Sequence, residues 1–86
     1  MSNKKKIETL QSALEGRNSE IEEYQINIEN YTRAIKKINA EHGDNQPILE
    51  FRDNLSNLLE SHKIEQLKSI IIRDVIAEQI NEMEGS

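Results

Sequence analysis

The chain contains no cysteine and no tryptophan among its 86 residues, and it has one proline and three glycines. Without cysteine, it forms no disulfide bond and cannot bind a metal ion through thiolates. A chain of this length buries about 60% of the surface that it exposes when unfolded, so its stability alone is marginal. The sequence therefore predicts one small domain, residues 1–84, that has no covalent reinforcement.

The chain also lacks any apolar run close to the roughly 20 residues that span a bilayer. Its first residues are basic, from Lys4 to Lys6, but Glu8 and Glu15 interrupt the next segment, which therefore cannot form the apolar core of a signal peptide. We expect a soluble protein of the cytoplasm, a compartment that the absence of cysteine also fits.

Positive charge is scarce, and the net charge is −5. Residues 4–41 hold seven basic and seven acidic side chains, whereas residues 47–86 hold four basic and eight acidic ones, with no basic residue after Arg73. A duplex-binding protein needs a basic face to displace counterions from the phosphates. The composition therefore argues against direct nucleic-acid binding.

Apolar residues repeat with alternating gaps of three and four along the first half of the chain. The repeat comprises Ile7, Leu10, Leu14, Arg17, Ile21, Tyr24, Ile28, Tyr31, Ile35 and Ile38. This 3.5-residue period predicts a helix over about residues 4–40 that packs with a left-handed coiled-coil crossing. Gly16 as a helix C-cap, with Ser19 and Glu22 as a capping box, leaves open a break into two helices. The preserved phase favours one continuous helix.

Residues 41–46 have the composition of a turn. Gly43 suits a left-handed C-cap, Asp44 or Asn45 can cap the next helix, and Pro47 fits its first turn. We therefore predict an antiparallel hairpin with a second helix over about residues 47–83.

The second helix has more apolar surface than one neighbouring helix can cover. Its first half carries one stripe, formed by Ile48, Phe51, Leu55, Leu58, Leu59 and His62. Its second half is broader, because three consecutive isoleucines at 70–72 point in directions 100° apart. The surplus predicts an all-α, coiled-coil-like four-helix bundle made by a homodimer, or a higher oligomer. The expected oligomer seam is Ile21, Tyr24, Ile28, Tyr31, Ile35, Ile38, Ile71 and Val75.

Nothing in the sequence forms a catalytic or metal-binding motif. His42 and His62 lack a histidine or Glu-x-x-His partner at helical spacing, and no glycine-rich phosphate loop or activated nucleophile is present. We expect a protein that is not an enzyme and needs no cofactor or metal. Tyr24 and Tyr31 are interpreted as core residues, the alternative being nucleobase stacking beside Arg17 or Arg33.

A candidate partner surface lies off the predicted seam. It combines Ile26, Ile64 and Leu67 with the acidic Glu78 and Glu82, the alternative being that the isoleucines and leucine pack inside a larger oligomer. The sequence favours a non-catalytic interaction protein that binds and modulates another protein. The alternatives are an acidic mimic of nucleic acid and an oligomer that sequesters a nucleotide.

In size, acidic balance and abundance of Asn, Ile, Lys and Glu, the whole chain resembles the small accessory proteins of tailed bacteriophages. That resemblance implies a host-takeover or counter-defence role in the host cytoplasm, and it assigns no function to any residue. Gly85 and Ser86 are interpreted as a cloning remnant outside the functional sequence.

Overall fold

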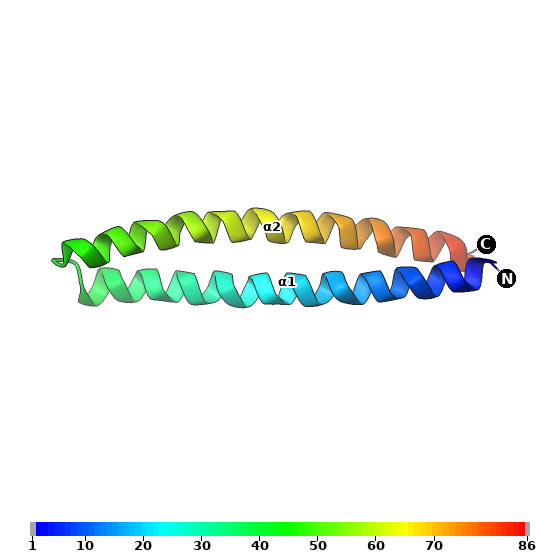
Figure 1. The fold of residues 1–86 in the computed structure, drawn as a ribbon, viewed down its shortest axis with the longest axis horizontal. Helices are drawn as coiled ribbons and strands as arrows, with labels where there is room; N and C mark the ends of the chain where they lie inside the picture. Colours follow the sequence, from blue (N-terminus) through cyan, green and yellow to red (C-terminus); the bar gives the residue numbers. More distant parts are fainter. Residues whose placement is uncertain (1, 86) are drawn as a thin grey trace.

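The computed structural model describes residues 2–85, which form two long helices joined by a short turn (Figure 1). Helix α1 spans Ser2–Glu41 and helix α2 spans Gln46–Gly85. They run antiparallel beside each other, and the Cα atoms span 65 × 16 × 14 Å. The predicted all-α helical hairpin is confirmed, and each helix extends slightly beyond its expected bounds. Gly85 is the last residue of α2, and Ser86 lies outside the described residues.

Helix α1 continues without a break through Gly16–Ser19, as the heptad phase favours. A Cβ atom placed on Gly16 would meet nothing within 4 Å, so the glycine fills no tight contact. Glycine in a helix interior costs about 1 kcal/mol relative to alanine. The regular packing of the residues before and after Gly16 against α2 outweighs that local cost.

Asn45 caps the N-terminus of α2, and Gly43 does not have positive φ. The backbone N–H of His42 donates to the Ile38 carbonyl at 2.8 Å, and the N–H of Ile48 donates to Asn45 Oδ1 at 3.2 Å. Of the two predicted caps, the structure therefore uses Asn45, and Pro47 lies in the first turn of α2. The prediction of a left-handed Gly43 is wrong, because no glycine among the described residues has positive φ.

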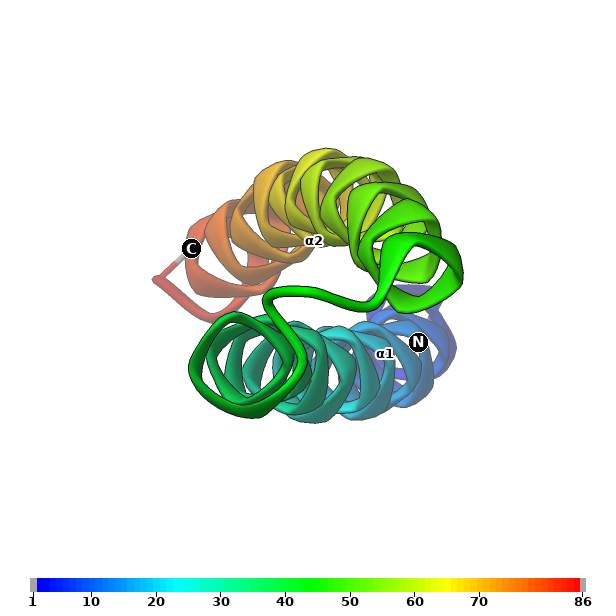
Figure 2. The same cartoon turned by 90° about the vertical axis from the view of Figure 1, so that its left-hand side faces the viewer.

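The predicted stripe of α1 faces α2 along the whole hairpin. Ile21, Tyr24, Ile28, Tyr31 and Ile35 are half-buried, and Ile38 is buried. The end-on view shows the helices slanting across each other, as expected when a 3.5-residue stripe keeps facing its partner (Figure 2). The apolar spacing of α1 thus corresponds to a seam within one chain.

The seam of α2 follows the same spacing and contains Ile48, Leu55, Leu59 and His62 of the expected stripe, but not Phe51 or Leu58. It runs through buried or half-buried positions at intervals of three and four, namely Ile48, Arg52, Leu55, Leu59, His62, Gln66, Ser69, Arg73, Ile76, Ile80 and Met83. Phe51 and Leu58, which the sequence pattern assigns to the stripe, are 51% and 44% exposed. Each directly precedes a seam residue in the sequence, so it lies beside the seam on the helix surface, where α1 covers it only in part.

Candidate interaction surface

The middle of the hairpin seam is polar. Gln66 Nε2 of α2 donates to the Ile21 carbonyl at 3.2 Å and to Gln25 Oε1 at 2.9 Å. One turn further along α2, Ser69 is 2% exposed and its hydroxyl donates to Glu20 Oε1 at 3.1 Å. These bonds satisfy polar side chains that would otherwise cost free energy on burial. Between His62 and Arg73, therefore, α2 turns its polar side toward α1.

Glu20 also ties the polar centre to Arg17, the one polar member of the α1 repeat. Arg17 Nη1 lies 3.3 Å from Glu20 Oε2, and the other carboxylate oxygen, Oε1, accepts the hydrogen bond from the Ser69 hydroxyl. Arg17 is therefore paired with a carboxylate of its own helix. The three side chains form one connected polar layer.

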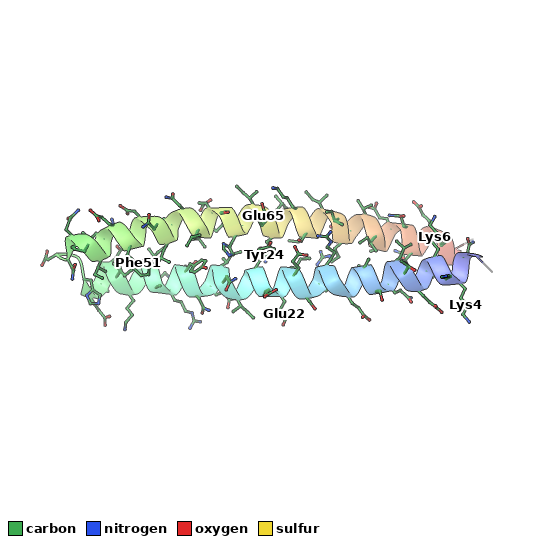
Figure 3. All side chains as sticks on the ribbon, viewed as in Figure 1. Lys4, Lys6, Glu22, Tyr24, Phe51 and Glu65 are labelled. Atoms are coloured by element: carbon green, nitrogen blue, oxygen red, sulfur yellow. The ribbon has the colours of Figure 1, made fainter. Side chains whose placement is uncertain are left out.

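An aromatic layer stands beside the polar centre. His62 lies between Tyr24 and Tyr31, edge-on to both rings, with centroid distances of 5.7 and 5.2 Å. His62 Nδ1 lies 2.8 Å from the Leu58 carbonyl, which can only accept, so Nδ1 carries the hydrogen. Figure 3 shows Tyr24 between the two helices. Rings that pack in the seam are not free platforms for a nucleobase, so the nucleotide-sequestering alternative gains no support.

The apolar side chains of the same segment of α2 face outward. Ile64 follows His62 by two residues, which turns it about 200° around the helix and away from α1. We define the outer apolar stripe as Ile64, Leu67, Ile71 and Val75, whose exposed fractions are 56%, 56%, 55% and 47%. Ile72, at 41%, widens the stripe on one side. In this segment, α2 therefore faces α1 with polar side chains and exposes apolar side chains to solvent.

Two residues of the predicted oligomer seam, Ile71 and Val75, lie in this outer stripe. The sequence predicts that a second copy covers both residues, and in the single hairpin each stands opposite the contact with α1. The physical reason is the heptad phase of α2, which determines the side of the helix on which the contact with α1 lies. The apolar residues at both ends of α2 fix one line of contact, and residues 66, 69 and 73 lie on that line between them.

The structure does not bring the predicted partner surface together as one face. Ile26 is 53% exposed, but it lies on α1 midway between the seam residues Tyr24 and Ile28, and so points away from α2. Ile64 and Leu67 point away from α1. The two groups therefore lie on opposite sides of the hairpin, and Ile26 cannot share a contact with the outer apolar stripe.

Charged side chains of both signs lie beside the outer apolar stripe, and the unpaired ones are acidic. Glu60 precedes it and is paired with Lys63 at 3.4 Å, while Lys68 within it is paired with Glu65 at 2.9 Å. Glu78 and Glu82, which come after it on the same face, are exposed, and no ion pair within residues 2–85 neutralises them. Negative charge is therefore concentrated at the C-terminal end of the stripe.

Sequence reasoning missed Gln66 and Ser69 as interior residues and Ile72 as part of the surface. The heptad spacing was compatible with their positions, although it did not select them over the isoleucines. Extending the spacing of Leu55 and Leu59 forward by threes and fours leads through residues 62, 66, 69 and 73 to Ile76 and Ile80. The three consecutive isoleucines hid that line, because apolar character alone marked them as core.

Other kinds of site find little support in the described part of the chain. No three His, Asp or Glu side chains in residues 2–85 are grouped so that they could hold a metal ion. Neither helix is apolar enough over a sufficient length to cross a membrane, as far as the described residues go. A hollow at the tip is lined by the consecutive residues 39–47, so it is the concave side of the turn. Comparison of the chain with protein-family models, curated proteins and solved structures finds no match.

Proposed function

We propose that this protein is a non-catalytic helical interaction protein, in which the hairpin holds α2 rigid and presents the outer apolar stripe to another protein. One observation carries the proposal. Seven of the eight exposed large apolar side chains of the described chain lie on α2, and five of them fall between residues 64 and 75. Scattered apolar residues are ordinary on a protein surface, but a contiguous stripe marks a contact site.

The polar centre of the seam strengthens this proposal. If α2 served only to complete the hairpin, its apolar side between residues 64 and 75 would gain most by facing α1. Instead, the inward side carries Gln66 and Ser69, whose hydrogen bonds to α1 are made in the orientation that exposes Ile71. This orientation of α2 leaves the outer apolar stripe accessible to a partner protein.

A homodimer, as expected from the sequence, is the second candidate use of the same surface. It is favoured by the thin core, since four apolar side chains of the described chain are buried and none of the large ones is fully buried. Such a dimer would have to pair α2 with α2, because Ile26 is the one exposed large apolar side chain that the structure describes on α1. A bundle using both helices equally has less support.

The experiment compares patch variants with a matched control in an affinity capture from cell extract. The resemblance to phage accessory proteins makes an extract of a bacterial host the first choice, with the partner expected in the host cytoplasm. Leu67→Ser combined with Ile71→Ser should remove any captured protein, whereas Ile26→Ser, the same kind of change on the opposite side, should retain it. Circular dichroism should show equal helicity for all three proteins. Equal capture by the patch variant and the control would refute the proposed function.

A further inference from the structure

We propose that the outer apolar stripe binds one amphipathic helix of a partner protein, and that basic side chains at one end of that helix pair with Glu78 and Glu82. This inference rests on the proposed function and adds the chemistry of the partner. It follows from the shape of the stripe, from the distribution of charge along it, and from the poor fit of a second copy.

The stripe has the spacing that a packed helix recognises. Ile64, Leu67, Ile71 and Val75 stand at intervals of three, four and four residues, so they form one ridge along α2. At 1.5 Å per residue the ridge is about 16 Å long, or about three helical turns. An amphipathic helix with apolar anchors at matching intervals can cover a ridge of this length. Ile72 on one flank would give such a helix a second row of contact.

The charge at the two ends of the stripe is unequal. At the N-terminal end, Glu60 is already paired with Lys63. At the C-terminal end, Glu78 lies one turn after Val75 and Glu82 lies one turn further, and no basic residue follows Arg73. Unpaired carboxylates at one end attract a partner whose positive charges are at the corresponding end. The partner helix should therefore bind in one direction, with its basic end beside Glu78 and Glu82.

Among residues 2–85, no ion pair joins a lysine near the N-terminus of α1 to Glu78 or Glu82. Lys5 lies two residues from Ile7, on the side of α1 that points away from α2, whereas Glu78 points away from α1. The hairpin separates the two faces by its own width, and charges further apart than about 8 Å are largely screened at physiological salt. Negative charge therefore remains available at this end of the stripe.

A second copy of the chain fits the stripe poorly. In an antiparallel pair that sets Ile64 against the second copy's Val75, Glu78 and Glu82 come level with the second copy's uncharged Ser61 and Asn57. In a parallel pair, Glu78 meets itself. Either arrangement also brings together two chains with a net charge of −5. The antiparallel arrangement gives these two acids no basic residue at the same level, and the parallel arrangement sets like charges opposite each other. Both favour a basic partner over self-association.

Two synthetic, helix-constrained peptides of about 20 residues test the inference, since shorter unconstrained helices are marginal in water. Both carry the same apolar stripe. One has two lysines at the positions that would face Glu78 and Glu82, and the other has two glutamates there. Fluorescence anisotropy should show that the full-length protein binds the basic peptide about tenfold more tightly than the acidic one, the size expected for two exposed ion pairs. The difference should shrink as salt is raised.

Charge reversal makes the test specific. Glu78→Lys combined with Glu82→Lys should invert the preference, so that the acidic peptide binds more tightly. Glu22→Lys combined with Glu29→Lys makes the same change in net charge on exposed positions of α1, and it should leave the preference as it is in the unchanged protein. Leu67→Ser combined with Ile71→Ser should abolish binding of both peptides while circular dichroism shows the helices intact.

The outcomes separate this inference from the proposed function. Equal binding of both peptides, with the loss on Leu67→Ser and Ile71→Ser retained, would overturn the charge-directed inference and leave the stripe as an interaction surface. Binding of neither peptide, together with a sedimenting dimer that the serine variant dissociates, would overturn it in favour of a second copy. Peptide binding that survives the serine changes would overturn the inference and remove the outer stripe from the proposed function as well.

Discussion

Ile76 and Ile71 offer a direct test of which side of α2 is the interior. They stand five residues apart on one helix, but Ile76 is 8% exposed and Ile71 is 55% exposed. Replacing either with alanine makes the same chemical change and brings the same small gain in helix propensity, a few tenths of a kcal/mol. The difference between the two variants therefore isolates burial.

The expected magnitudes come from that difference in exposure. Truncating a buried isoleucine to alanine costs about 2–5 kcal/mol, and a hairpin that is only two helices thick can partly close the space, so we expect about 2–3 kcal/mol for Ile76→Ala. Ile71→Ala loses about half of a burial worth about 1.5–3 kcal/mol, part of which the gain in propensity offsets. We expect the free energy of unfolding to fall by less than about 1 kcal/mol there.

Urea and thermal denaturation followed by circular dichroism at 222 nm measure both effects. A gap of about 2 kcal/mol corresponds to a difference in Tm of about 8–16 °C for a chain of this size. Each melt should be repeated at several protein concentrations, because association makes Tm depend on concentration. If Ile71→Ala destabilises as much as Ile76→Ala, and if Tm rises with concentration, the outer stripe is buried in an oligomer and the reasoning about its exposure fails.

Three further predictions concern the turn, the glycines and the aromatic layer. Asn45→Ala should lower the free energy of unfolding by about 1 kcal/mol through loss of the cap on α2, whereas Asn45→Asp should restore it; an unchanged urea midpoint for the alanine variant would contradict the cap. Gly16→Ala should raise the free energy of unfolding by about 1 kcal/mol, and Gly43→Ala should be tolerated. Neither glycine has positive φ, and an added Cβ would meet at most the Asn39 carbonyl at 3.7 Å. Strong destabilisation by Gly43→Ala would indicate a left-handed turn after all. Tyr31→Phe should shift Tm little, while Tyr31→Ala should cost about 3 kcal/mol through loss of packing against His62; an unaltered Tm for the alanine variant would remove Tyr31 from the seam.

The amino-acid sequence by itself determined the two helices, the turn between them and the inward stripe of α1. These features depend on short-range chemistry. A 3.5-residue repeat fixes which side of α1 is apolar, and the cluster of Gly43, Asp44, Asn45 and Pro47 ends one helix and begins the next. The continuity of α1 through Gly16 could also be predicted, because the repeat keeps its phase on both sides of the glycine.

The tertiary structure alone decided which side of α2 faces inward. Between residues 62 and 75 this helix is apolar on more than one side, so local pattern cannot choose among them. Packing on both sides of this segment decides the orientation. Leu55 and Ile76 are buried against α1, and they fix a line of contact that continues between them. That line passes through Gln66 and Ser69, which find hydrogen-bond partners on α1, and it leaves Ile71 outside. A coiled-coil seam keeps one phase along its whole length, so packing far away determines which side chains are exposed in the middle.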